Sequence, residues 1–149
     1  MSIARWPAVW RGVVLVIGLS GPLLPAAQAQ DAAAAEALEA YFDFVDYQGG
    51  NLGLGQIPDD QWARYVVIDT RDAAQFAKGH IPGAKNIEWR RVVAERAHIP
   101  KDKPVLVYCN TGTLSSQAGL ALRVLGWENL QILHGGFEEY KAAGKPVSP

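Results

Sequence analysis

The stretch that decides the fold is residues 104–125, which read PVLVYCNTGTLSSQAGLALRVL. An apolar run at 105–108 predicts a buried strand, and it ends at Cys109. Small and polar residues at 110–113 follow, and Ser115 then opens a stretch with helical spacing. The apolar positions of that stretch share one helix face: Ala118, Leu122 and Leu125. The pattern therefore predicts a strand, a tight loop and a helix, with the cysteine at the carboxyl end of the strand.

The position of Cys109 favours chemistry over packing. In open α/β sheets, ligands bind in the crevice outside the carboxyl ends of the strands. The helix beyond the loop offers unpaired N–H groups and the positive end of its dipole. Loop amides that turn inward form an anion-binding nest. A sulfur at the centre of such a nest is stabilised as thiolate, which is the nucleophilic form.

The simpler interpretation is that Cys109 is a small buried hydrophobe, which is a common role for a free cysteine. A packing cysteine would more commonly lie within the strand than directly after it. Cys109 is also the only cysteine among 149 residues, so it cannot form an internal disulfide. Both observations favour a reactive thiol.

The first 29 residues have the pattern of a secretory signal. Two arginines precede an apolar run at 13–19, glycine and proline then interrupt any helix, and Ala27-Gln28-Ala29 places small residues at a cleavage site. The apolar run is shorter than the 20 or so residues that span a bilayer. We expect cleavage after Ala29 and a periplasmic protein without stable membrane insertion, with an uncleaved anchor as the alternative. The predicted organisation is a signal peptide at 1–29, a helical extension at 30–50 and one domain at 51–149.

Charge and composition exclude some functions. Without residues 1–29 the chain has 12 Lys and Arg against 15 Asp and Glu, a net charge of −3. Such a chain lacks the basic field that nucleic-acid binding requires. The three histidines lie far apart and there is one cysteine, so no metal-ligand spacing is present. We therefore expect no nucleic acid, no metal and no other cofactor.

The segment before the first buried strand is expected to begin with a helix. Residues 32–46 combine high helix propensity with a cluster of aromatic side chains, and Asp31 is placed to cap them. We expect this helix to lay its aromatic side chains on the domain. A short edge strand is expected near 52–57.

Strands and helices alternate along the rest of the chain. Apolar runs predict buried strands at 65–69 and 129–133, while Pro82 and its neighbouring glycines make 79–87 non-helical. Three further helices are predicted, at 74–77, 88–97 and 137–143. This alternation predicts a single α/β domain, with a mainly parallel sheet of about five strands flanked by helices on both faces.

Four motifs then occur in a characteristic order. They are Asp69-Thr70-Arg71, GHIPGA at 79–84, Cys109 at a strand end, and Gly135-Gly136-Phe137. With YCN-x-G followed by S-x-Q-A in residues 108–118, the chain resembles the rhodanese family, and best the small, single-domain, exported rhodaneses. The resemblance covers approximately residues 58–147. It implies a sulfurtransferase (a transferase of sulfur-containing groups) in which the cysteine cycles through a persulfide.

The resemblance also implies site residues and substrates. By the match Cys109 is the catalytic nucleophile, and the amides of the following loop face its sulfur; that loop comprises Asn110, Thr111, Gly112, Thr113, Leu114 and Ser115. Ser115 and Ser116 are expected to cap the next helix, and they are candidates to add a hydroxyl to the rim of the loop. Asp69 and Arg71 are expected to support the site as an ion pair or loop brace, and His80 and His134 to be structural. The implied donor is a small sulfur-containing anion such as thiosulfate or a persulfide, and the acceptor is cyanide, a small thiol or a protein thiol.

One feature departs from the family pattern. Many active rhodaneses carry an arginine or lysine in the loop to hold the sulfonate of the donor, whereas residues 110–117 contain no charge. Thr113 stands where the exported relatives tend to have arginine. A lost charge-assisted contact costs about 1.5–3 kcal/mol, so we expect turnover at a raised KM for thiosulfate. Arg71 or a basic residue outside the loop is a candidate to compensate.

Two other classes of function remain as alternatives. A cysteine phosphatase or arsenate reductase needs an arginine after five intervening residues to bind an oxyanion, and Ser115 stands at that place. A non-catalytic binding module would instead use the aromatic helix at 31–47 and the uncharged loop, because a fold does not determine a function.

Overall fold

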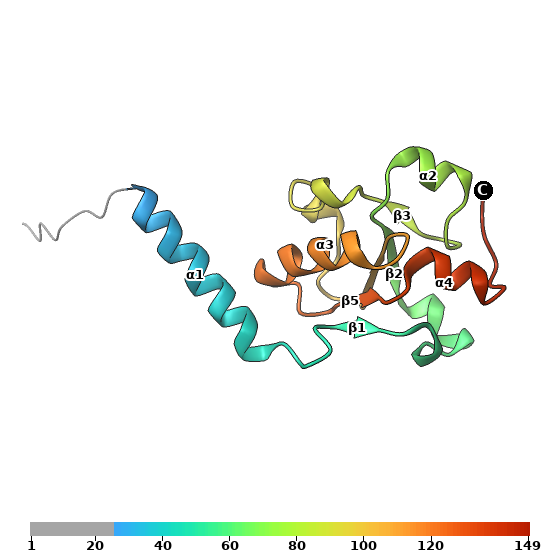
Figure 1. Cartoon of the computed structure of the whole chain (residues 1–149), viewed down its shortest axis with the longest axis horizontal. Coiled ribbons are helices and arrows are strands. Elements are labelled where there is room, and N and C mark those ends of the chain that lie inside the picture. The colour runs from blue at the N-terminus through green and yellow to red at the C-terminus, as the bar shows by residue number, and fades with distance from the viewer. Residues whose placement is uncertain (1–25) are drawn as a thin grey trace, which may run out of the picture.

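The computed structural model of the chain describes residues 26–149 and shows a five-stranded sheet in the order β1-β5-β4-β2-β3 (Figure 1). Every neighbouring pair of strands is parallel. The strands are β1 Asn51–Leu52, β2 Val66–Asp69, β3 Lys85–Asn86, β4 Val105–Tyr108 and β5 Leu130–Leu133. The helices are α1 Ala26–Phe44, α2 Ala73–Lys78, α3 Thr113–Val124 and α4 Gly136–Ala142. The predicted α/β fold with a parallel sheet of about five strands is confirmed.

The central strand β4 is buried on both faces, and its side chains alternate between two apolar cores. Val105 and Val107 pack with α3 and the segment 87–99 in one core. Leu106 and Tyr108 pack with α4 and the 3-10 helices that precede β2 in the other. This alternation is the expected consequence of the two-residue period of a strand. Helices therefore cover both faces of the sheet, as predicted.

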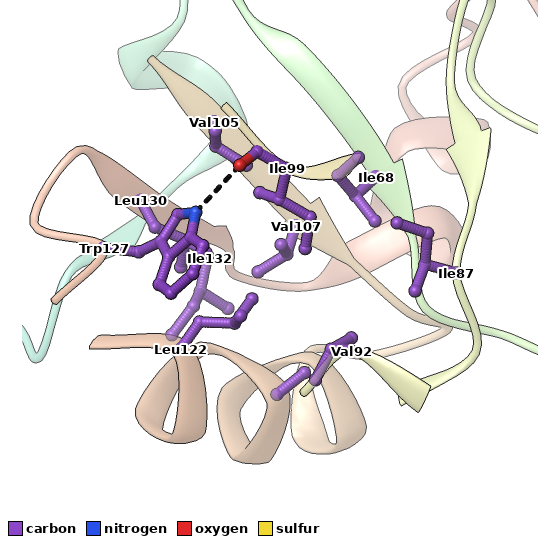
Figure 2. Close-up of a cluster of buried hydrophobic side chains, with 11 residues drawn as sticks. Ile68, Ile87, Val92, Ile99, Val105, Val107, Leu122, Trp127, Leu130 and Ile132 are labelled. Carbon is purple, nitrogen blue, oxygen red and sulfur yellow. Dashed lines mark hydrogen bonds between the residues drawn. The ribbon is translucent and has the colours of Figure 1, made fainter. Parts of the chain in front are cut away.

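Helix α3 lies close to β5 because Gly119 has no side chain. A Cβ at this position would come within 2.8 Å of Ile132 Cδ1. Beyond the helix, the indole Nε1 of Trp127 donates to the carbonyl of Ile99 at 3.0 Å and closes the core (Figure 2). Leu125, predicted on the buried face, is 44% exposed because α3 ends one residue before it. This packing fixes where α3 begins, directly after the Cys109 loop.

Helix α1 extends away from the sheet, and it corrects two expectations (Figure 1). Asp31 lies inside the helix and does not cap it, because the alanine-rich turns on both sides continue the helix. Of the aromatic side chains only Tyr41 is buried; those that stay exposed are Phe42, Phe44 and Tyr47. No helix within residues 26–149 combines the length and apolar character needed to cross a membrane. The predicted signal segment falls mainly on residues 1–25, which lie outside the described part of the chain.

The helix predicted at 88–97 is wrong. The segment instead contains two 3-10 helices, Trp89–Arg91 and Arg96–His98, joined by turns. The backbone N–H of Trp89 donates to the carbonyl of Thr70, which ties the start of the segment to the end of β2. The β-branched pair Val92-Val93 also lowers helix propensity. Val92 and Ile99 still reach the core from this irregular segment.

The two edge strands are each two residues long. The edge strand expected near 52–57 is β1, which ends at Leu52, and residues 54–56 form a 3-10 helix. Strand β3 lies within the segment expected to be a loop. A two-residue strand shows no periodicity in its sequence, so only pairing with β2 and β5 reveals these strands.

Candidate active site

The sulfur of Cys109 lies at the mouth of the loop between β4 and α3, facing backbone amide groups. The backbone N–H of Gly112 donates to Sγ at 3.2 Å, and the hydroxyl of Ser115 lies 3.6 Å from it. Cys109 is only 2% exposed, yet it belongs to neither apolar core. The buried sulfur thus lies against hydrogen-bond donors of the loop.

These donors change the acidity of the thiol. Burial raises the pKa of Cys109, but the hydrogen bonds outweigh it and the net pKa is lower than that of an ordinary cysteine. The donors are the backbone N–H and hydroxyl of Ser115 and the backbone N–H groups of Thr111 and Gly112. Donors that bond to the charged form favour it, so this loop shifts the thiol toward thiolate.

The start of α3 differs from the expected capping arrangement. Gly112 occupies the N-cap position at φ +103°, where a left-handed backbone turns the loop amides toward the sulfur. Ser115 and Ser116 were expected to cap the helix, but the Ser116 hydroxyl donates back to the carbonyl of Gly112 at 2.7 Å. The single proton of the Ser115 hydroxyl has two acceptors in reach, this carbonyl at 3.0 Å and the sulfur at 3.6 Å. Ser115 therefore contacts both the turn and the sulfur. Thr111 and Thr113 are exposed, with their hydroxyls 3.3 Å apart, and Leu114 is half-buried.

The glycine pair before α4 supports the loop from behind. The backbone N–H of Phe137 donates to the carbonyl of Cys109 at 2.8 Å, and that of Glu138 to the carbonyl of Asn110 at 2.9 Å. A Cβ at Gly136 would lie 2.5 Å from the Cys109 carbonyl oxygen, and its φ is +56°. Only glycine permits this approach, which gives the Gly135-Gly136-Phe137 motif a structural reason.

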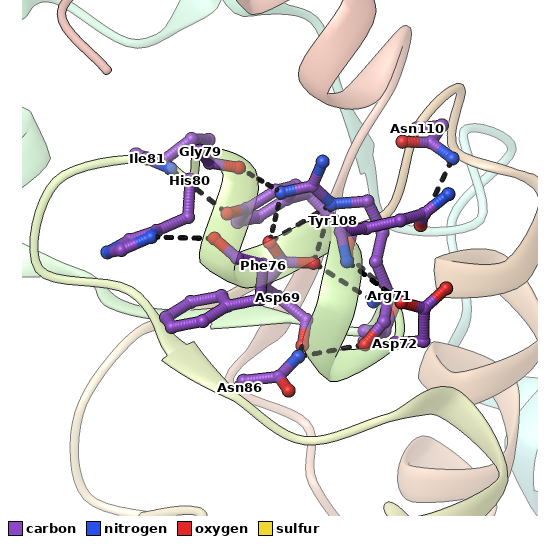
Figure 3. A network of polar contacts seen from close by, with 12 residues as sticks. Asp69, Arg71, Asp72, Phe76, Gly79, His80, Ile81, Asn86, Tyr108 and Asn110 are labelled. Atoms are coloured by element: carbon purple, nitrogen blue, oxygen red, sulfur yellow. Dashed lines mark hydrogen bonds and ion pairs between the residues drawn. The ribbon is translucent and has the colours of Figure 1, made fainter. Parts of the chain in front are cut away.

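Asp69 and Arg71 form the expected ion pair at the end of β2 (Figure 3). The guanidinium lies 2.5 Å from Asp69 Oδ2 and also donates to the carbonyl of Gly79 at 2.7 Å. Burial alone lowers the pKa of Arg71, but its hydrogen bond and charge interaction with Asp69 raise it overall. Both side chains are buried and committed to each other, so neither is free to bind substrate.

Sequence reasoning missed Tyr108 and Asn86, which join this network to the GHIPGA segment. The Tyr108 hydroxyl accepts from the backbone N–H of Ile81 at 3.1 Å, and burial and Asp69 raise its pKa, so the phenol stays neutral. Asn86 donates to the carbonyls of Asp69 and Arg71, at 3.0 and 2.8 Å. These partners are far apart in sequence, so no local pattern shows them (Figure 3).

The two histidines differ in environment. His80 stacks on Phe76 with ring centroids 3.9 Å apart, and its Nδ1 lies 3.1 Å from the carbonyl of Phe76, which is a structural role as expected. His134 is exposed after β5. Within residues 26–149, no group of three or more His, Cys, Asp or Glu side chains is arranged to hold a metal ion.

The family model described as a rhodanese-like domain matches residues 54–143, more than half of the chain. The chain belongs to the rhodanese family. A sulfurtransferase of Allochromatium vinosum is 32% identical over 82 residues, covering 55% of this chain and 77% of that protein. The thiosulfate sulfurtransferase GlpE of Pseudomonas putida is 38% identical over 77 residues, covering 52% of this chain and 70% of that protein.

Solved structures support the fold of this rhodanese. The crystal structure of a rhodanese-related protein from Thermoplasma volcanium superimposes with a TM-score of 0.61 and is 24% identical. The superposition covers 66% of this chain and 96% of the Thermoplasma volcanium chain. At this identity the similarity establishes the architecture alone.

A cavity of about 370 Å³ lies beside the loop that follows Cys109 in this rhodanese. Asn110 forms part of its wall, and the Asn110 amide contacts Gln75 of α2 at 3.4 Å. The cavity lies between α2, α4 and the C-terminal tail; its other lining residues are Arg71, Lys78, Gly79, Phe137, Glu138, Lys141 and Val147. The loop itself carries no charge, so the cations that line this cavity come from other segments: Arg71 follows β2, Lys78 ends α2 and Lys141 lies in α4.

Proposed function

We propose that this rhodanese is a sulfurtransferase that carries sulfane sulfur as a persulfide on Cys109. The observation that supports this most is the sulfur enclosed by hydrogen-bond donors, with Gly112 N–H at 3.2 Å. A cysteine that served only to pack the core would not need these donors. The named activities of the similar proteins point to the same class of reaction.

The proposed reaction has two displacement steps. In the first, the Cys109 thiolate attacks the outer sulfur of thiosulfate, the S–S bond of thiosulfate breaks, and sulfite leaves with the electron pair. In the second, an acceptor such as cyanide or a thiolate attacks the outer sulfur of the persulfide, and Cys109 leaves as thiolate. The inward-facing amides stabilise sulfur anions in both steps without moving, which is how preorganised dipoles assist catalysis.

The uncharged loop is expected to affect donor binding more than chemistry. No charged side chain in residues 110–117 can hold the sulfonate of thiosulfate. The thiolate-stabilising amides do not depend on such a side chain. We therefore propose that thiosulfate serves as a donor with a raised KM, and that persulfides are donors as well.

Intact mass spectrometry tests the covalent intermediate directly. Incubation of the chain with thiosulfate, or with a persulfide donor, should add one sulfur, about 32 Da, to Cys109. The matched control is Cys109→Ala, which should take up no sulfur and show background turnover. An unchanged mass of the unsubstituted chain with every donor would contradict the proposal.

A binding module is the second candidate, because α1 and the turn that follows it expose large aromatic side chains. Phe42 is 65% exposed and Tyr47 fully exposed. Equal near-background activity of the unsubstituted chain and Cys109→Ala would favour this module. The phosphatase alternative has no comparable support, since Ser115 stands at the arginine position and contacts the sulfur.

We also propose export to the periplasm with cleavage after Ala29. This cleavage would remove the first turn of α1, which begins at Ala26, and leave the rest of the helix at the new N-terminus. N-terminal sequencing of the protein from a periplasmic fraction tests this, and an intact residue 1 would contradict it.

A further inference from the structure

The cavity beside the loop contains the positive charge that the loop lacks. Lys78 at the end of α2 and Lys141 in α4 both line it, and Asn110, the residue after Cys109, forms part of the same wall. The two lysines belong to separate helices, Lys78 to α2 and Lys141 to α4, which are both labelled in Figure 1. A ligand held there would thus lie next to the reactive loop.

The charges around this cavity do not cancel. Arg71 is neutralised by Asp69, at 2.5 Å. Lys141 pairs with Glu138 at 3.2 Å, on an exposed surface where such a pair is weak. Lys78 has no ion-pair partner among the described residues 26–149. The cavity therefore has a net positive charge and attracts an anion.

The size of the cavity indicates an organic anion. Its volume of about 370 Å³ lies within the range of small-molecule sites, about 300–1,000 Å³, and exceeds the needs of a single inorganic ion. Phe137 supplies an apolar floor, with the Lys141 ammonium 5.1 Å from its ring centroid. The side-chain amides of Asn110 and Gln75 also line the cavity. Their hydrogen bond to each other is long at 3.4 Å, so both amides can bond to a ligand as neutral groups.

We propose that this cavity binds the carboxylate of a low-molecular-weight thiol that accepts sulfur from Cys109, with Lys78 and Lys141 as the residues that determine specificity. This inference rests on the proposed persulfide function. In the transfer, the acceptor thiolate attacks the outer sulfur of the Cys109 persulfide. The bond between the two sulfurs breaks, its electron pair stays on Sγ, and the acceptor leaves as a persulfide. The lysines hold the carboxylate and take no part in the bond changes.

Two thiols that differ in the carboxylate provide the test. The persulfide form of the chain is prepared with excess donor and freed of it, and its discharge is timed by mass with 3-mercaptopropionate or 2-mercaptoethanol. Replacing both lysines, as Lys78→Gln with Lys141→Gln, should slow discharge to 3-mercaptopropionate about tenfold or more, the loss expected for charge-assisted contacts. Discharge to neutral 2-mercaptoethanol should not change.

Lys103→Gln is the matched control, because Lys103 is exposed and lies just before β4, at the opposite end of that strand from Cys109. It should leave both discharge rates unchanged. Equal slowing with the two thiols, no slowing in the double variant, or the same slowing in Lys103→Gln would overturn the carboxylate site while the persulfide function stands. Failure of the unsubstituted chain to form the persulfide would overturn the proposed function itself, and the inference with it.

Discussion

The carboxyl ends of the neighbouring strands β2 and β4 stabilise buried charge in different ways. At the end of β2, Asp69 and Arg71 carry full charges, and both are buried. At the end of β4, Cys109 lies among backbone N–H groups in a loop with no charged side chain. Because β2 and β4 are parallel neighbours, their carboxyl ends lie side by side at the same end of the strands.

The difference shows which kind of charge can act on a substrate here. A buried full charge needs a partner of opposite sign, and the pair that results is neutral and fixed. Backbone dipoles need no counter-ion, so they remain available to stabilise an anionic sulfur. Phe137 connects the two regions. The Arg71 guanidinium lies 4.0 Å from the centroid of the Phe137 ring, and the backbone N–H of Phe137 donates to the Cys109 carbonyl. The ion pair thus supports the scaffold, and the loop amides favour the anionic form of the sulfur.

The largest expected loss of stability comes from breaking the ion pair. Asp69→Asn leaves the buried Arg71 guanidinium without a counter-charge, which should lower the free energy of unfolding by about 3–5 kcal/mol. Urea denaturation measures this effect. Adding Arg71→Leu to Asp69→Asn should recover part of the loss, because it removes the unpaired charge. A loss below about 1 kcal/mol in Asp69→Asn would show that the pair is not an essential part of the scaffold.

Strain in the amide loop should have a smaller effect on stability but a specific one on activity. Gly112→Ala forces alanine to φ +103°, which should cost about 1–3 kcal/mol, while the new Cβ meets only ordinary contacts at 3.6 Å or more. Sulfur transfer should fall because the amides no longer converge on Sγ. Gly144→Ala, at φ +68° in open space, is the control and should lose similar stability but keep its activity. Parallel losses of activity in the two variants would contradict a special role for the loop.

The smallest expected effect is on the pH dependence of persulfide formation. Ser115 lowers the pKa of Cys109, so Ser115→Ala should raise that pKa and move the rate profile toward higher pH. The sign follows because a higher pKa leaves less thiolate at a given pH. Ser116→Ala is the matched control, since its hydroxyl donates to the Gly112 carbonyl and has no contact with the sulfur. The rate of persulfide formation is measured by stopped flow across a pH series. An unchanged pH profile in Ser115→Ala would show that the hydroxyl has no effect on the thiol.

The contrast between β4 and segment 88–97 shows how far local patterns reach. The apolar run at 105–108 is short, continuous and bounded by turn residues, and the strand it predicted is confirmed. The helix predicted at 88–97 failed because hydrogen bonds to the end of β2 hold the start of that segment in another conformation. Long-range backbone partners of this kind leave no periodic signal.

The candidate site shows the same division. The position of Cys109 after a strand, and the order of the four motifs, could be read from the sequence because they depend on local spacing. The partners of these residues could not: the backbone N–H of Ile81 donates to the Tyr108 hydroxyl, and that of Phe137 to the carbonyl of Cys109. Nor could the sequence show that Lys78 and Lys141 line one cavity, since 63 positions separate them.

The sequence by itself therefore determined the rhodanese fold, its three longer strands β2, β4 and β5, and the choice of Cys109 as the nucleophile to propose. Only the tertiary structure decided which donors face the sulfur, that Ser115 contacts it instead of capping α3, and which cations border the loop. The physical reason is that strands and helices arise from contacts between near neighbours. The electrostatics of a site are set by atoms that the folded sheet brings together from distant segments.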